Sequence, residues 1–250
     1  MGFLFRPKEL PRPASLTFTL DQAGHTYDDG HVGLAPTDIT ISELRVAVIG
    51  LNGAGKSTLL GLLDGSLKAN AGTVTIAGGE ERLDPAVKKD AKRIDNLVGK
   101  VRREEIPNSF YQAANISEAV SEALKKHKVP ESERHARIGN LFAHFDLAQV
   151  SKAKASELDS EKRHLLAIAA ALSFEPSAIV ADEPSKGLDE IGAAHVAKAL
   201  FSYNKQVIFA THDTDMIRRP EYAIDRVLVL AEAVAFYEDL IRRKYEAAKR

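Results

Sequence analysis

Gly50-Leu51-Asn52-Gly53-Ala54-Gly55-Lys56-Ser57-Thr58 is the stretch that decides the fold of this chain. It follows a mostly apolar run, residues 44–49, and precedes a second one, residues 59–63. The pattern G-x-x-x-x-G-K-[ST] between a strand and a helix is that of a phosphate-binding loop. Glycines let successive backbone N–H groups point at a polyphosphate, and the N-terminus of the helix adds a favourable dipole. The stretch therefore predicts a nucleoside triphosphate site.

Side chains within the loop have distinct expected roles. We expect Lys56 to reach the β- and γ-phosphates and the Ser57 hydroxyl to ligate Mg²⁺. A glycine-rich turn with an incidental lysine is the alternative, and the complete pattern in its strand-to-helix context argues against it. The other loop residues expected to contact the nucleotide are Asn52, Gly53, Ala54, Gly55 and Thr58.

The bulk properties are those of an ordinary globular protein. The 250 residues suffice for one large domain or two small ones, and the formal net charge of −1 gives no electrostatic case for nucleic acid as the main partner. The chain has no cysteine, which excludes disulfides and thiolate metal sites. Its N-terminus lacks the pattern of a signal peptide, and its longest apolar run, residues 165–172, is too short to span a bilayer.

Short β-rich runs separated by helical patterns predict a doubly wound α/β fold. Four of them predict a parallel core sheet: residues 46–49, 179–181, 207–210 and 227–230. Three runs with period-two alternation predict an antiparallel β layer beside the nucleotide: residues 15–20, 37–41 and 72–79. The stretch from 117 to 172 has a helical pattern with a break at Pro130, which predicts a helical insertion between two core strands.

We expect a single domain over residues 1–250. Residues from about 15 to 100 and from about 175 to 230 form its nucleotide-binding core, and residues from about 101 to 174 form a helical subdomain. The first fourteen residues, with three prolines, predict an irregular arm. Residues 231–250 predict a C-terminal helix whose cluster Arg242-Arg243-Lys244 forms a solvated face.

Two carboxylates end the apolar strand 178–182. Asp182 is placed beside the phosphate loop, where it holds Mg²⁺ directly or through water. Glu183 points elsewhere and is placed to polarise an attacking water as a general base. His212 ends the next core strand, and we expect it to hydrogen-bond the γ-phosphate. An acidic turn and a structural histidine are the alternatives, which the phosphate loop upstream disfavours.

These motifs, in this order, resemble the nucleotide-binding domain of ATP-binding cassette transporters over about residues 15–230. The family's A-loop aromatic, which stacks on adenine, corresponds to Tyr27. Within the family, the arrangement is most similar to the energy-coupling-factor group, which drives vitamin and cobalt or nickel uptake. The other matching segments are GLNGAGKST (50–58), AIVADEP (178–184), Ser185-Lys186-Gly187-Leu188-Asp189, which is similar to the D-loop, and FATHD (209–213).

The resemblance implies a P-loop NTPase fold and an ATPase that uses ATP and Mg²⁺. Its catalytic residues would be Glu183 and His212, and its metal ligands Ser57 and Asp182. It implies two partners, a transmembrane permease subunit and a second cassette, in a homodimer or a heterodimer. It also implies an importer subunit that is cytoplasmic and peripheral on the inner face of the cell membrane.

The family's signature helix opens with LSGGQ, where this chain has Leu158-Asp159-Ser160-Glu161-Lys162. In the family, the serine hydroxyl and glycine N–H groups of this motif touch the ATP of the partner subunit. Asp159 takes the serine position and Glu161 replaces a glycine. A carboxylate about 4 Å from phosphate repels it by about 4 kcal/mol per unit charge pair at an effective dielectric constant of about 20. We expect Asp159 to cap its own helix, Lys162 to offset part of the repulsion, and the signature to be impaired.

The family's Q-loop glutamine is also missing. Counting forward from the strand 98–101 puts Arg103 at its position, and counting back from residues 115–118 puts Glu105 there. Gln112 lies too far along the chain to replace it. In the family this loop senses Mg²⁺ and water and touches the transmembrane subunit, so we expect altered coupling.

Two function classes stay open at this stage. The chain is either an ATPase that dimerises on nucleotide and powers import, or an ATP-binding subunit that hydrolyses poorly and supports a partner cassette. A GTPase is disfavoured because Asn204-Lys205-Gln206-Val207 lacks the aspartate of the guanine-binding motif Asn-Lys-x-Asp. A soluble cassette protein acting on ribosomes or DNA usually carries two cassettes or a long coiled-coil insertion, and neither is present.

Overall fold

The computed structural model describes residues 15–102 and 106–230. Several predictions lie outside these described residues: the N-terminal arm, Arg103 and Glu105 as candidates for the glutamine position, and the C-terminal helix with its basic cluster. Within the described ranges, no helix is both long enough and apolar enough to cross a bilayer.

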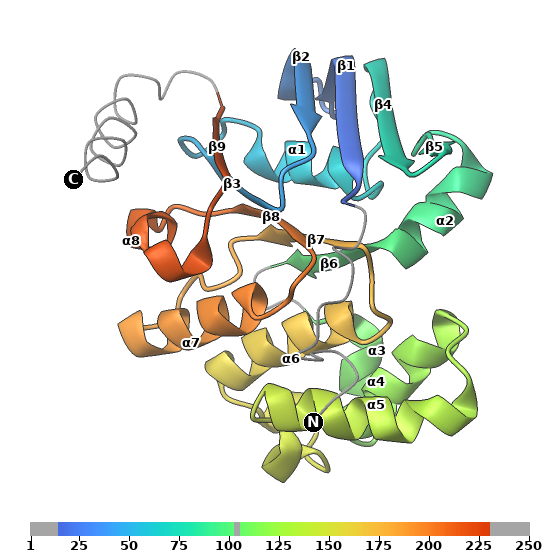
Figure 1. The fold of residues 1–250 in the computed structure, drawn as a ribbon, viewed down its shortest axis with the longest axis vertical. Coiled ribbons are helices and arrows are strands. Elements are labelled where there is room, and N and C mark those ends of the chain that lie inside the picture. The colour runs from blue at the N-terminus through green and yellow to red at the C-terminus, as the bar shows by residue number, and fades with distance from the viewer. Residues whose placement is uncertain (1–14, 103–105, 231–250) are drawn as a thin grey trace.

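A parallel sheet forms the centre of the molecule, as predicted (Figure 1). Its strand order is β6-β7-β8-β3-β9, and all four neighbouring pairs are parallel. The three inner strands are apolar and buried on both faces, which is why they read as continuous hydrophobic runs. The strands are β3 (Arg45–Ile49), β6 (Val98–Arg102), β7 (Ala178–Asp182), β8 (Gln206–Ala210) and β9 (Arg226–Val229).

The predicted antiparallel layer lies above this sheet in Figure 1 and has the order β2-β1-β4-β5. Its strands are β1 (Thr17–Thr26), β2 (Val32–Ile41), β4 (Ala71–Gly78) and β5 (Glu81–Leu83). β1 continues well beyond the predicted end at Leu20 because an irregularity in its pairing absorbs the break in alternation. Gln22 has a φ of 46° there, and the pairing resumes on the far side.

Helix α1 (Lys56–Leu63) lies between the two sheets and is buried along almost its whole length. It packs against β7 and β8 of the core and against β2 and β4 of the antiparallel layer. Helix α2 (Lys88–Leu97) connects β5 to β6. The phosphate loop that precedes α1 is therefore held between both layers of the protein.

Helices gather on the other side of the core sheet. The predicted helical subdomain contributes α3 to α6, and α7 and α8 follow the core strands β7 and β8. They are α3 (Asn108–Gln112), α4 (Ile116–Lys126), α5 (Glu131–His144), α6 (Ser160–Leu172), α7 (Glu190–Phe201) and α8 (Thr214–Arg218). Pro130 is the N-cap of α5, which accounts for the predicted break. The continuous helical pattern predicted up to Leu172 is wrong between α5 and α6, where two 3-10 turns, Ala148–Val150 and Ala155–Glu157, replace it.

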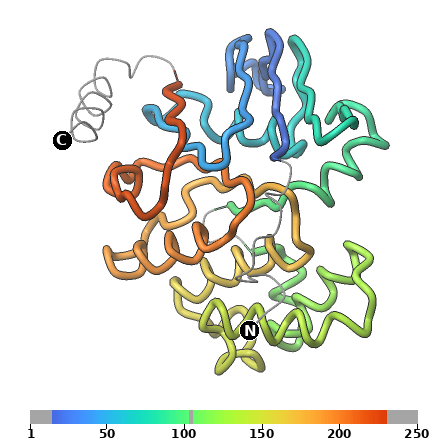
Figure 2. The backbone as a smooth tube through the Cα atoms, in the orientation of Figure 1, coloured from blue at the N-terminus to red at the C-terminus, as the bar shows by residue number. Residues whose placement is uncertain are grey.

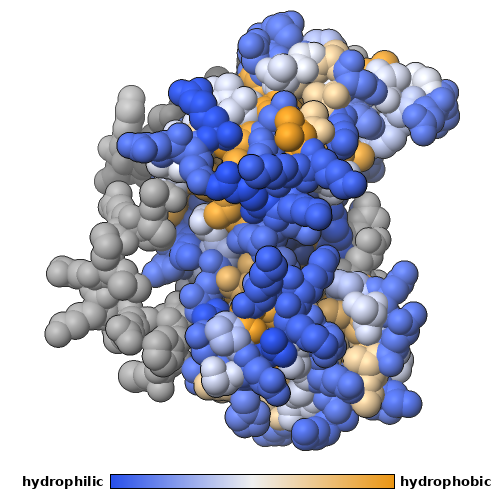
Figure 3. All heavy atoms as spheres, turned by 90° about the vertical axis from the view of Figure 1, so that its right-hand side faces the viewer, coloured by the Kyte–Doolittle hydropathy of each residue, from blue (hydrophilic) through white to orange (hydrophobic). Residues whose placement is uncertain are grey.

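The face at the right of Figure 1 is mostly hydrophilic, with small hydrophobic areas that hydrophilic side chains separate (Figure 3). Large exposed apolar side chains of the described residues come from many different elements rather than from one patch. They are Tyr27, Val32, Leu44, Leu51, Val87, Tyr111 and Ile191.

Strands β3 and β9 are far apart in the sequence and lie side by side in the core sheet (Figure 2).

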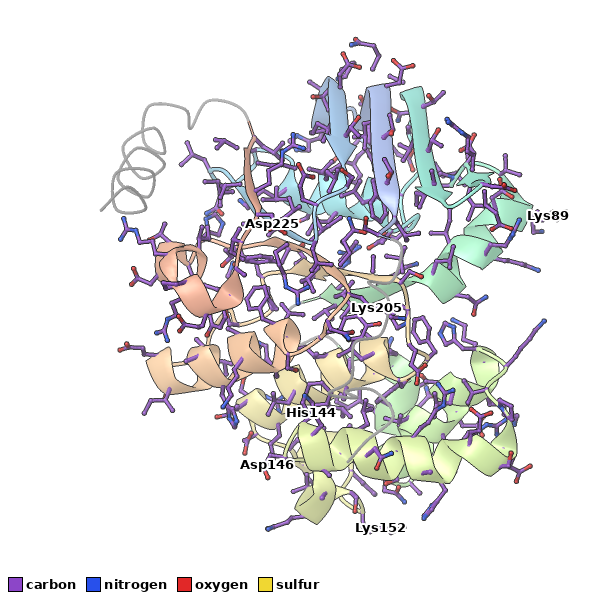
Figure 4. The ribbon with its side chains drawn as sticks, viewed as in Figure 1. Lys89, His144, Asp146, Lys152, Lys205 and Asp225 are labelled. Carbon is purple, nitrogen blue, oxygen red and sulfur yellow. The ribbon has the colours of Figure 1, made fainter. Side chains whose placement is uncertain are left out.

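Arg45 is buried and anchors the start of β3. Its backbone N–H donates to Asp225 Oδ2 at 2.8 Å. Its guanidinium donates to the main-chain oxygens of Tyr203 and Lys205, and to that of Phe201 at 3.4 Å. Lys205 and Asp225, both labelled in Figure 4, immediately precede β8 and β9. One side chain thus satisfies carbonyls that the turn after α7 leaves without donors.

We predict that Arg45→Met lowers the free energy of unfolding by about 2–4 kcal/mol, because it leaves buried carbonyls without donors. Urea unfolding followed by circular dichroism measures the loss. Arg93→Met is the matched control, since the Arg93 side chain is 45% exposed and pairs with Glu81 at the surface. The control should lose less than about 1 kcal/mol. Equal losses in the two variants would contradict the proposed anchoring role of Arg45.

Candidate functional site

A cavity of about 250 Å³ opens where the central core strands end. The phosphate loop after β3 forms its floor, the ends of β7 and β8 form one wall, and the turn between β1 and β2 forms another. Ligands of open α/β sheets bind at this edge, outside the carboxyl ends of the strands. Its lining residues are Tyr27, His31, Gly33, Asn52, Gly53, Gly55, Lys56, Ser57, Thr58, Asp182, Glu183, Lys186 and His212.

The phosphate loop has the backbone conformation that its glycines predict. Gly53 and Gly55 have φ angles of 85° and 90°, in the left-handed region that favours glycine. The Lys56 ammonium is folded back on the loop and donates to the carbonyls of Gly50 at 2.9 Å and Leu51 at 3.0 Å. Burial lowers the pKa of Lys56, and the carboxylates of Glu183 and Asp182 oppose that shift. The Lys56 ammonium is thus held among polar groups at the N-terminus of α1.

The structure brings Glu183 and His212 into contact. Glu183 Oε1 lies 3.1 Å from His212 Nε2, and the Glu183 backbone N–H donates to the Ala210 carbonyl at 3.0 Å. Glu183 has a φ of 50°, a left-handed conformation that is uncommon for glutamate. The contact with His212 falls outside hydrogen-bond geometry, so Glu183 Oε1 is a buried acceptor without a hydrogen-bond partner among the described residues. Such an acceptor in a cavity suits a water or ligand hydroxyl.

The donor set of the cavity also fits a magnesium ion. Asp182 is buried at the end of β7, and Ser57 is the second residue of α1. No group of three or more histidine, aspartate or glutamate side chains suited to a metal occurs in the ranges that the structure describes. Mg²⁺ in nucleotide sites uses only one or two protein ligands together with phosphate oxygens and water. Ser57 and Asp182 are the residues that would hold it.

Tyr27 lies at the cavity, where its resemblance to the A-loop aromatic places it. Its hydroxyl is hydrogen-bonded to Thr58 Oγ1 at 3.0 Å, which ties the turn between β1 and β2 to α1. His31, Gly33 and Lys186 also line the cavity and were not among the predicted site residues. Lys186 follows Glu183 by three residues and adds a second cation near Lys56. Predicted Ala54 is not among the lining residues, and neither is Gln112 at the end of α3.

The altered signature segment is engaged within this chain. Asp159 is the N-cap of α6 and accepts from the Lys162 backbone N–H at 2.7 Å, which confirms the predicted cap. Glu161 Oε1 lies 2.7 Å from His195 Nδ1 on α7. Lys162 Nζ lies 3.9 Å from the carboxylate of Asp146, which Figure 4 labels among the helices. All three charged side chains of the segment therefore have partners inside the protein.

Comparisons with known proteins agree with this geometry. The family model described as ABC transporter matches residues 37–186. A Deinococcus radiodurans protein assigned as an ABC transporter ATP-binding protein is 34% identical over 210 residues, which cover 84% of this chain and 87% of that protein. The energy-coupling factor transporter ATP-binding protein EcfA of Methanocaldococcus jannaschii is 31% identical over 208 residues, covering 82% and 72% of the two chains.

A solved structure shows the same architecture. The structure of cbiO1 from Clostridium perfringens, described as part of the ABC transporter complex cbiONQ, superposes with a TM-score of 0.73. It is 27% identical in sequence, and the match covers 92% of this chain and 94% of that one. The arrangement of a parallel core sheet, an antiparallel layer and helices is therefore that of a shared P-loop NTPase fold. The chain belongs to the ATP-binding subunits of the ABC transporter family.

Proposed function

We propose that this chain hydrolyses Mg·ATP and, paired with a second cassette, powers import through a separate transmembrane subunit. The observation that carries the proposal is the cavity in which Lys56, Ser57 and Asp182 meet Glu183 and its neighbour His212. A phosphate-binding lysine, a metal-binding pair and a carboxylate that can orient water are recurring parts of sites for phosphoryl transfer to water.

Each residue has one task in this proposal. Lys56 leaves the carbonyls of Gly50 and Leu51 to bind phosphate oxygens. Ser57 and Asp182 would hold a magnesium ion, which would neutralise charge on the phosphates. Glu183 Oε1 accepts a proton from the attacking water, since this buried oxygen has no hydrogen-bond partner among the described residues. His212 hydrogen-bonds the terminal phosphate from beside Glu183.

The assembly is proposed by analogy with relatives. The Methanocaldococcus jannaschii relative is named as the ATP-binding protein of an energy-coupling factor transporter, and cbiO1 is described as part of the ABC transporter complex cbiONQ. We propose that this chain likewise joins a transmembrane subunit and a second cassette at the cytoplasmic face of the membrane. Purification of the chain from its native membrane, followed by identification of the proteins that co-purify, tests this part. Recovery without any membrane protein would contradict it.

We predict that Glu183→Gln lowers ATP turnover by about 100-fold or more and leaves the dissociation constant of Mg·ATP within about threefold. Glutamine keeps the shape of the side chain but cannot accept the proton. Phosphate release measures turnover, and calorimetry measures binding. Glu131→Gln, an exposed carboxylate on α5, is the matched control and should change neither quantity. Unchanged turnover in Glu183→Gln would remove this residue from the catalytic role.

A second candidate function is a cassette that binds ATP and hydrolyses it poorly in a homodimer. The observation in its favour is the signature segment, where Asp159 caps α6 and Glu161 contacts His195. These carboxylates occupy positions from which the family's motif contacts the phosphates of a partner subunit. In a heterodimer, the phosphate loop and carboxylates of this chain would still form a complete site with an intact signature of the other cassette.

A variant that restores the family's signature, Asp159→Ser with Ser160→Gly and Glu161→Gly, distinguishes the two candidate functions. We predict that it raises turnover of the homodimer by about tenfold or more, which requires the removal of only about 1.4 kcal/mol of repulsion. Asp159→Ser alone is the folding control, because serine also caps helices well and should leave the unfolding midpoint unchanged. A wild-type homodimer that hydrolyses ATP as fast as the restored variant would rule out the second candidate.

A further inference from the structure

A second aromatic ring lies beside Tyr27 in the nucleotide cavity. The rings of Tyr27 and His31 have centroids 6.2 Å apart and planes that differ by 16°. Both side chains line the cavity, and the only other ring in its lining is that of His212, which contacts Glu183 at the phosphate end. The two nearly parallel rings therefore form an aromatic pair in the cavity lining that is separate from the contact between Glu183 and His212.

The turn between β1 and β2 fixes the relative position of these rings. The Tyr27 N–H donates to the His31 carbonyl at 2.9 Å, and the Gly30 N–H donates to the Tyr27 carbonyl at 2.9 Å. The His31 N–H donates to Asp29 Oδ1 at 2.9 Å, and Gly30 has a left-handed φ of 84°. These bonds close the turn on both residues, so the two rings are held as a unit.

Contacts from outside the turn hold the Tyr27 side of this unit, and they include the edge of the His25 ring, whose centroid lies 4.7 Å from that of Tyr27. The Tyr27 hydroxyl is bonded to Thr58 on α1, while the imidazole of His31 is exposed at the cavity. An exposed pair of nearly parallel rings beside a phosphate loop is suited to a flat apolar group that is attached to the phosphates. A nucleobase is such a group, because every base has a π face that stacks on aromatic side chains, histidine included.

We propose that His31 is a base-contacting residue that forms, together with Tyr27, the surface on which the purine of the nucleotide rests. The inference rests on the proposed function, since it assigns the base end of the same cavity. His31 supplies ring area that a tyrosine alone does not, and its place in the closed turn makes that area available before the nucleotide arrives.

The test compares a ligand that has a base with one that has none. Calorimetry gives the dissociation constants of Mg·ATP and of magnesium tripolyphosphate for the wild type and for His31→Ala. Loss of one stacking partner should weaken ATP binding by about tenfold, and tripolyphosphate binding should stay within about twofold. His31→Phe, which keeps a ring, should recover most of the ATP affinity. His135→Ala, an exposed histidine on α5, should behave like the wild type.

The outcomes separate the two proposals. If the wild type binds neither ligand, the proposed function fails. If it binds both and His31→Ala leaves ATP affinity unchanged, or weakens both ligands equally, the assignment of His31 to the base fails while the phosphate site stands. Failure of His31→Phe to recover affinity would likewise overturn a stacking role.

Discussion

The nucleotide cavity depends on a close backbone approach between the phosphate loop and the start of β2. A Cβ atom at Gly55 would lie 2.5 Å from the carbonyl oxygen of Gly33. A Cβ atom at Gly33 would collide with the ring of Tyr27 and would lie 2.8 Å from Thr58 Oγ1. Side chains at either glycine would push the antiparallel layer away from the core. The hydrogen bond between Tyr27 and Thr58 requires that the layers remain this close.

The core sheet then supplies the remaining groups from one edge. β3, β7 and β8 are neighbours and parallel, so their carboxyl ends deliver Lys56, Glu183 and His212 to the same place. Burial of these strands on both faces fixes their register, and Arg45 satisfies the carbonyls at the opposite end of the sheet. The 3.1 Å contact joins Glu183, the first residue after β7, to His212, two residues after β8. Strand order brings these two groups to the same edge of the sheet, and the residues that follow the strands complete the contact.

Local patterns predicted most of this arrangement from the sequence. The phosphate loop, the strand-end carboxylates and the Asp159 cap each depend on a few consecutive residues. The structure brings the loop and the carboxylates to one cavity and contains the cap, while the catalytic and metal-binding roles stay predictions. His31 and Lys186 were missed because their place in the cavity depends on how a turn and a strand end meet across two layers. The pairing of Glu161 with His195 joins two helices, and neither residue carries a local signal of the other.

The partners of the signature segment have an energetic consequence for any dimer. To present its N–H groups to a phosphate, α6 must release the Asp159 cap, and loss of such a cap typically costs about 1 kcal/mol. The contact with His195 turns the Glu161 carboxylate toward α7. The carboxylate keeps its negative charge in this position. In the phosphate loop, Lys56 must release two backbone carbonyls to bind phosphate, and both of them belong to the loop itself. Within this chain, the phosphate loop would therefore need less rearrangement to bind a nucleotide than the signature segment would. An efficient site in a dimer would favour a partner whose signature segment has no such internal contacts.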